Sequence, residues 1–184
     1  MKSLAVFCGS QFGTDPAYAA AAAELGAELA RRGVALVYGG GRVGLMGVVA
    51  TACVAAGGRV VGVIPEFLAA KEIAFADATE LHVVATMHQR KAIMADRADA
   101  VAVLPGGYGT MDELFEILTW AQLGLHAKPV ALLNINGFFD PLLTWADHLT
   151  REGFVQRRHR ELLLVADDVA KLFETLARRG PDVR

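Results

Sequence analysis

Short apolar runs alternate along the chain with longer segments in which apolar residues recur at helical spacing. The apolar, often β-branched runs predict strands near 2–8, 34–38, 59–64, 80–84, 99–104 and 129–133. The segments between them predict helices near 16–32, 45–57, 87–97, 110–125 and 138–151. The tail adds a short strand near 162–165 and a helix at about 168–178, with Asp167 or Asp168 as its N-cap. The chain therefore has a repeated β-α-β pattern.

The predicted strands lack polar alternation. Segments 60–64 and 130–133, for example, are apolar throughout. Parallel strands that helices cover on both faces have this composition. We therefore predict an α/β fold with a Rossmann-like, doubly wound parallel sheet flanked by helices. In such sheets ligands bind beyond the carboxyl ends of the strands, where segments 8–10 and 65–66 and two glycine-rich loops are expected.

Composition indicates a single domain. The chain has 184 residues, of which 54% are hydrophobic, and no linker-like or low-complexity segment divides it, so we expect one domain over 1–184. A net charge of −2 argues against a general nucleic-acid binder. The basic segment 156–160 is assigned to a solvated face or an interface, without a function of its own.

The N-terminal apolar run ends at Gly9-Ser10, which is too short for a signal peptide or a membrane span, so we expect a cytoplasmic protein without membrane contact. Cys8 and Cys53 belong to no CxxC or His/Cys cluster. We interpret them as buried free thiols and expect no metal site.

Segment 105–113, with the sequence PGGYGTMDE, has the layout of a phosphate-binding loop. Its glycines follow an apolar strand and lead into a helix, so backbone N–H groups and the positive end of the helix dipole can face an anion. Glu113 places a carboxylate one turn inside that helix. A second glycine-rich loop, 39–47, follows another predicted strand. One such loop is weak evidence, but two together favour a nucleotide phosphate as the ligand.

Two charged side chains are candidates for chemistry. Arg90 lies near the start of the predicted helix 87–97, where a guanidinium can hold a phosphate or ribose oxygen; the alternative is a surface ion pair. Glu113 shares a helix flank with Glu116 and Trp120, which places both carboxylates along the crevice. The alternative for Glu113 is an acid that only stabilises the helix start. Trp120, Met46, Met87 and Met94 are interpreted as packing residues.

The chain resembles the Lonely Guy family of cytokinin-activating phosphoribohydrolases, whose members were long labelled lysine decarboxylases. Segment 105–113 meets the PGGxGTxxE signature in full, and the motifs CGSQFG, YGGGRVGLMG, GGRVVGVIP, MHQRKAIM and LTWAQLGLHAKPV occur in the family's order. Plant members often read Ala-Asp-Met-His where this chain has 85–88 as Ala-Thr-Met-His, so an acidic group near Arg90 is absent.

The resemblance implies hydrolysis of the N-glycosidic bond of an adenosine 5′-monophosphate, often N6-modified, to a free base and ribose 5-phosphate. It implies no cofactor and a homodimer whose interface is formed by helices near the site. Arg90 and Glu113 become the catalytic pair. The residues implied to contact substrate are Glu72, Lys91, Gly106, Gly107, Tyr108, Gly109, Thr110 and Thr119, with Gly40, Gly41 and Gly44 of the second loop enclosing the site.

Several alternatives remain open at this level. The substrate can be a cytokinin precursor or ordinary AMP in purine salvage, and the chain can be a nucleotide-binding module without catalysis. A decarboxylase would need a cofactor such as pyridoxal phosphate, for which Lys91 and Lys128 are available. A dinucleotide-dependent oxidoreductase is disfavoured, because segment 8–13 lacks the G-x-G-x-x-G spacing.

Overall fold

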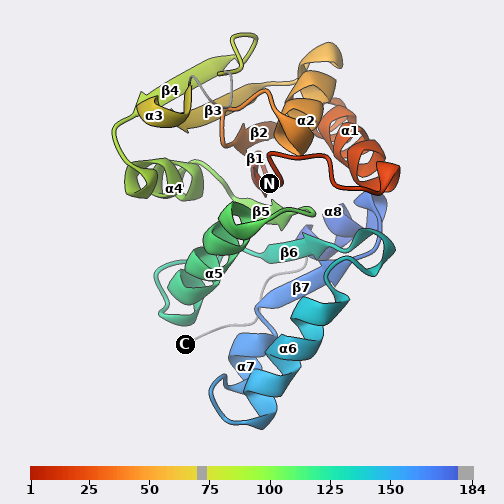
Figure 1. Cartoon of the computed structure of the whole chain (residues 1–184), viewed down its shortest axis with the longest axis vertical. Helices are drawn as coiled ribbons and strands as arrows, with labels where there is room; N and C mark the ends of the chain where they lie inside the picture. The colour runs from red at the N-terminus through yellow and green to blue at the C-terminus, as the bar shows by residue number, and fades with distance from the viewer. Residues whose placement is uncertain (70–73, 178–184) are drawn as a thin grey trace.

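The computed structural model describes residues 1–69 and 74–177, in which seven parallel strands form one sheet (Figure 1). The strands are β1 (Ser3–Phe7), β2 (Ala35–Tyr38), β3 (Val60–Pro65), β4 (Glu80–Val84), β5 (Ala100–Val103), β6 (Val130–Leu133) and β7 (Leu163–Ala166). Their order in the sheet is β4-β3-β2-β1-β5-β6-β7. The chain thus extends the sheet from β1 in one direction and then, starting with β5, in the other. The switch point between β1 and β5 is where ligands of open α/β sheets bind.

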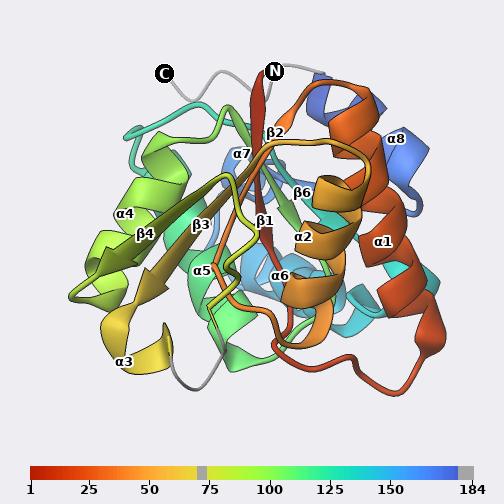
Figure 2. The ribbon, with the colours of Figure 1, turned by 90° about the horizontal axis from the view of Figure 1, so that it is seen from above.

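Helices cover both faces of this sheet, as Figure 2 shows from above. They are α1 (Pro16–Arg31), α2 (Gly44–Ala55), α3 (Glu66–Ala69), α4 (Met87–Asp96), α5 (Tyr108–Gln122), α6 (Asp140–Arg151), α7 (Arg157–Arg160) and α8 (Val169–Ala177), with a 3-10 turn η1 (Ile135–Gly137). The predicted fold class is confirmed, and each predicted strand and long helix is present to within a few residues at its ends. The short elements α3, α7 and η1 were not predicted.

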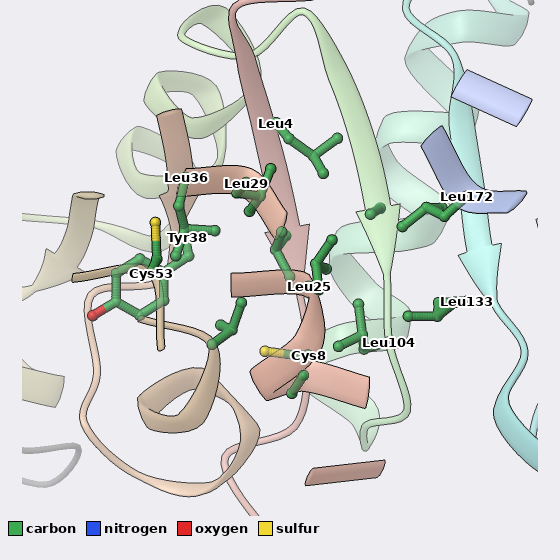
Figure 3. Close-up of a cluster of buried hydrophobic side chains, with 14 of the residues drawn as sticks. Leu4, Cys8, Leu25, Leu29, Leu36, Tyr38, Cys53, Leu104, Leu133 and Leu172 are labelled. Carbon is green, nitrogen blue, oxygen red and sulfur yellow. The ribbon is translucent and has the colours of Figure 1, made fainter. Parts of the chain in front are cut away.

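The sheet separates two layers of buried apolar side chains. One layer lies under α1, α2 and α8 and includes Leu25, Val49 and Leu172; Figure 3 shows part of it. The other lies under α4 and α5 and includes Met94 and Leu114. Burial on both faces explains why the central strands are apolar throughout, since neither face of such a strand meets water.

Local signals in the sequence fix the helix ends. Asp15 caps α1 by accepting a hydrogen bond from the Ala17 amide at 2.8 Å, and Pro16 occupies the first turn, where its missing N–H costs nothing. Of the two predicted caps for the last helix, Asp168 is the one that accepts a bond from a backbone amide, that of Lys171 at 2.7 Å. The basic segment forms the short helix α7, where Arg160 pairs with Asp147 of α6 at 2.7 Å.

The edge strand β4 is joined to its neighbours by a charged cluster around Glu80. Its carboxylate binds Arg59, which directly precedes β3, and Arg97 at the end of α4, the latter at 2.8 Å. His82 lies 3.2 Å from the same carboxylate. The two arginines hold the pKa of Glu80 down at about 2, because their hydrogen bonds favour the ionised form, and His82 adds to the effect.

Candidate active site

The N-terminus of α5 faces an open space. Gly107 is the N-cap residue and offers no side-chain acceptor to the first amides of the helix. A Cβ atom added at Gly107 or Gly109 would meet no atom within 4 Å, whereas one added at Gly106 would lie 2.1 Å from the Thr110 hydroxyl oxygen. The loop is therefore packed against the protein at Gly106 and open to a ligand at the next two glycines. This is the geometry expected for binding a phosphate at a helix start.

A cavity of about 150 Å³ lies at this helix start, at the carboxyl ends of β1 and β5. It is lined by Cys8, Ser10, Met46, Arg90, Gly107, Tyr108, Gly109, Thr110 and Glu113. Both predicted catalytic residues therefore line the same cavity as the phosphate-binding loop. Sequence reasoning placed segment 8–10 at this edge but gave Cys8 and Ser10 no role, and it assigned Met46 to packing only.

Arg90 is buried, with only 5% of its surface exposed, and backbone carbonyls hold its guanidinium. Its Nε donates to the Val63 carbonyl at 3.1 Å, and its Nη2 donates to the Gly39 carbonyl at 2.8 Å. Val63 lies in β3 and Gly39 directly follows β2, so the ends of two strands orient the side chain. The surface-ion-pair interpretation of Arg90 is wrong, because the side chain lies inside the molecule.

Gly39 is a glycine because Arg90 needs the room. A Cβ atom at position 39 would lie 2.0 Å from Arg90 Nη2. Real Cβ contacts are never that short, so any larger residue would move the guanidinium or the strand end. The first glycine of the second loop thus shapes the site through a neighbouring side chain.

Glu113 lies in the second turn of α5 and is 9% exposed. Its negative charge affects the pKa of Cys8, which directly follows β1. Burial raises the pKa of the Cys8 thiol, the negative charge of Glu113 raises it further, and the positive charge of Arg90 opposes them. The cavity thus holds a carboxylate and a guanidinium close enough to act on one bound molecule.

The second glycine loop contributes one residue, Met46, to the lining of the cavity. The first amides of α2, at Leu45 and Met46, donate to the Gly9 carbonyl at 3.0 and 3.4 Å. Gly40 and Gly44 have φ values of +77° and +56°, which glycine adopts without strain. At Gly44 a Cβ atom would also lie 2.3 Å from the Ser10 carbonyl carbon. This loop therefore packs against the β1–α1 loop, and Met46 is its contribution to the cavity lining.

Gly41 of the same loop pairs with Ala74 in an isolated bridge, and none of the three predicted glycines, Gly40, Gly41 and Gly44, lines the cavity.

Two predicted substrate contacts lie elsewhere in this chain. The Lys91 ammonium binds Asp112 at 3.0 Å and Glu116 at 3.1 Å. The Thr119 hydroxyl donates to the Phe115 carbonyl at 2.7 Å and lines a different, apolar groove between α5, α6 and α7. Glu72 lies outside the described residues.

Within 1–69 and 74–177, no three His, Cys, Asp or Glu side chains are grouped so that they could hold a metal ion. None of the helices in these two ranges is both long and apolar enough to cross a membrane.

Solved structures share this fold. A molybdenum cofactor carrier protein from Chlamydomonas reinhardtii superposes with a TM-score of 0.70 at 23% identity, over 96% of this chain and 98% of that one. A molybdenum cofactor binding protein from Rippkaea orientalis gives a TM-score of 0.69 at 22% identity, over 94% and 93%. These similarities concern the fold alone.

Proteins found by sequence comparison share a higher identity with this chain than these solved structures do. A family model described as "Possible lysine decarboxylase" matches residues 46–176. A cytokinin riboside 5′-monophosphate phosphoribohydrolase of Arabidopsis thaliana is 49% identical over 98% of this chain and 83% of its own length. A probable enzyme of the same name from Oryza sativa subsp. japonica is also 49% identical, over 98% and 79%. The chain therefore belongs to the Lonely Guy family, that of the cytokinin riboside 5′-monophosphate phosphoribohydrolases.

Proposed function

We propose that this protein hydrolyses the N-glycosidic bond of adenosine 5′-monophosphates, including N6-modified ones, to a free base and ribose 5-phosphate. The observation that carries the proposal is the shared cavity in which Arg90 and Glu113, both buried, lie beside the open start of α5. The names of the relatives support the reaction and the nucleotide class.

The glycine loop suits the phosphate end of such a nucleotide. The open amides at 107–110 and the positive end of α5 attract an anion with two negative charges. This contact is remote from the bond that breaks, so its binding energy orients the ribose against the catalytic groups. A riboside without phosphate should therefore react much more slowly than the monophosphate.

Glu113 is suited to the bond-breaking step. Cleavage between C1′ and the base nitrogen passes through an oxocarbenium-like state, which a nearby carboxylate stabilises. The oxygen of a water molecule bonds to C1′, and Glu113 accepts a proton from that water. The base leaves with the electron pair of the broken bond and takes up a proton from solvent, and Glu113 returns its proton to solvent, so the reaction consumes one water. Arg90 fixes the nucleotide, and its hydrogen bonds to the Val63 and Gly39 carbonyls keep the guanidinium in place.

The test is chromatography of the purified protein after incubation with AMP and with N6-isopentenyl-adenosine monophosphate. Wild type should release free base from at least one of them, and the ratio of the two rates separates cytokinin activation from general purine salvage. The Glu113→Gln variant should lose at least about 100-fold in kcat while AMP still raises its melting temperature. The matched control is Glu24→Gln, which neutralises an exposed carboxylate of α1 and should keep full activity.

A non-catalytic nucleotide-binding module would behave differently. Wild type would then release no base from either nucleotide, although both nucleotides would still stabilise it. A colourless protein that releases no carbon dioxide from lysine would argue against the decarboxylase alternative.

We further propose that the chain is a single cytoplasmic domain that works as a homodimer. All strands of the described ranges belong to one sheet, which supports one domain. Cys8 and Cys53 are free thiols, which suits a reducing compartment. Exposed apolar side chains on and after α5 and α6 support an interface there; they are Phe115, Leu123, Leu125, Trp145 and Phe154.

A further inference from the structure

Lys91 directly follows Arg90 in α4, but the two side chains lead to different parts of the protein. Arg90 binds the carbonyls at the ends of β2 and β3, whereas Lys91 binds two carboxylates of α5. Consecutive residues of a helix point about 100° apart, so one helix can hold a strand end and a neighbouring helix at the same time. Lys91 therefore connects the helix that carries Arg90 to the helix that carries Glu113.

The two partners of Lys91 lie on either side of Glu113 in the sequence of α5. Asp112 is the residue before it, and Glu116 is one turn after it. The ammonium group is 3.0 Å from the Asp112 carboxylate and 3.1 Å from that of Glu116. A shift of α5 along or around its axis would lengthen at least one of these contacts. The pair of contacts thus fixes the turn of α5 from which Glu113 projects.

The lysine side of this contact is shielded from water, whereas the Asp112 carboxylate is more than half exposed. Only 10% of the Lys91 side chain is exposed, compared with 24% for Glu116 and 56% for Asp112. Burial alone would lower the pKa of Lys91, but the hydrogen bonds to Asp112 and Glu116 outweigh it and raise the pKa. Lys91 is therefore charged at neutral pH and bound to both carboxylates. Partial shielding strengthens the contact with Glu116, while water screens the contact with the more exposed Asp112.

We propose that Lys91 is a positioning residue whose ammonium group joins α4 to α5 and thereby holds Arg90 and Glu113 at the separation that catalysis requires. The inference rests on the proposed function, and it differs from a direct contact of Lys91 with the substrate. A substrate contact would place the ammonium in the cavity, yet Lys91 is not among the residues that line it. The effect of Lys91 on the reaction should therefore depend on Asp112 and Glu116.

The test is a cycle of variants measured with AMP. Lys91→Met removes the charge but keeps most of the aliphatic chain, and the double variant Asp112→Asn/Glu116→Gln removes the partners. Each should lower kcat about tenfold with KM within about twofold of wild type, because a misplaced catalytic pair slows the chemical step more than it weakens binding. The triple variant should be no slower than Lys91→Met, since the same contact is already lost. Lys91→Arg should recover most of kcat.

The control is Lys171→Met. Lys171 also lies between two carboxylates, those of Asp167 at 3.4 Å and Asp168 at 3.5 Å, but all three residues lie at the start of α8, on the other face of the sheet. This variant should keep the kcat of wild type. Melting temperatures of all variants identify any that fail to fold, and the cycle can then be repeated with Glu116→Gln alone in place of the double variant.

Two results would overturn the proposal. If Lys91→Met raises KM and leaves kcat unchanged, Lys91 contacts the substrate. If the losses of Lys91→Met and of the double variant multiply in the triple variant, the lysine and the carboxylates act separately. An active wild type with either result refutes only the positioning role, whereas a wild type that cleaves no nucleotide refutes the proposed function and the positioning role together.

Discussion

The hydrogen bond between Arg90 and the Gly39 carbonyl makes position 39 a test of how the guanidinium is held. In Gly39→Ala, the new Cβ would lie 2.0 Å from Arg90 Nη2, so the guanidinium must leave the Gly39 carbonyl. We expect kcat/KM for AMP to fall by about 100-fold, while the free energy of unfolding falls by only about 1 to 3 kcal/mol. Steady-state kinetics and thermal unfolding of the same preparation measure both effects.

Gly26→Ala is the matched control for this variant. Its Cβ would lie 2.3 Å from the Val49 carbonyl oxygen, in the contact between α1 and α2. We expect a larger loss of stability, because the backbone of α2 cannot move aside as a side-chain end can, but no loss of kcat in the folded protein, because α1 does not hold Arg90. If Gly39→Ala keeps the kcat/KM of wild type, the hydrogen bond from Arg90 to the Gly39 carbonyl is not needed for the reaction.

The thiols provide a second test at the scale of single residues. Burial raises the pKa of Cys53 to about 11 and raises that of Cys8 as well, so both are neutral thiols at pH 7. The native protein should therefore react very slowly with Ellman's reagent, and the unfolded protein should release colour for two thiols. Rapid reaction of one thiol in the native protein would contradict this expectation, and Cys8→Ser would show whether the reacting thiol is the one that lines the cavity.

At the scale of elements, Glu80 links the edge strand β4 to β3 and α4. A carboxyl group whose pKa is lower in the folded than in the unfolded chain stabilises the fold above its unfolded value, and this contribution is lost as the pH falls toward the folded value. For Glu80 the window runs from 4.5 down to about 2. Glu80→Gln should therefore lower the melting temperature at pH 7, and the difference from wild type should shrink as the pH falls through this window.

A matched variant tests the direction of this effect. Glu161→Gln removes one exposed i,i+4 pair, with Arg157, and should change the melting temperature little at any pH. If the difference between Glu80→Gln and wild type grows as the pH falls, the cluster around Glu80 does not stabilise β4 in the way described.

Helices and strands could be predicted where their sequence shows a recognisable hydrophobic pattern. The strands and long helices each contain enough residues for an apolar run or a helical repeat to stand out, and Asp15 and Asp168 mark two helix starts. The helices α3 and α7 have four residues each, which is too short for any such repeat. Tertiary contacts hold them instead: α3 lies against β3 and β4, and Arg160 of α7 pairs with Asp147 of α6.

The parts of the site that could be predicted are those marked by a sequence motif or by a charged side chain at a helix start. Segment 105–113 and Arg90 were found from motif and position, and the structure places them around one cavity. The carbonyls of Gly39 and Val63 that hold Arg90 could not be found, because every residue has a carbonyl and the sequence does not say which one is in reach. Lys91 was assigned by family resemblance, and only its distances to Asp112 and Glu116 show which groups it binds.

At the scale of the whole molecule, the proposed homodimer can be tested through Trp145. Its ring, 46% exposed, packs edge-on against Phe115 at 5.7 Å between centroids, at the groove between α5 and α6. Trp145→Glu should turn the dimer into a monomer, because a charge in an apolar interface is costly to bury. Light scattering after size-exclusion chromatography gives the mass.

Val83→Glu is the control, since Val83 is 57% exposed on β4, at the far edge of the sheet. It should leave the mass unchanged. If it separates the subunits and Trp145→Glu does not, the interface lies at β4, and a monomeric wild type would refute the dimer altogether.

The strand order also has a consequence for how the protein forms during synthesis. As the chain leaves the ribosome, β2 can pair with the free edge of β1. In the same way β3 can pair with β2, and β4 with β3. When β5 emerges, the other edge of β1 is still free, and β6 and β7 follow outward from it. No strand has to enter between two that are already paired. The docking of β5 beside β1 then brings segment 107–113 next to Cys8 and Ser10 and completes the cavity.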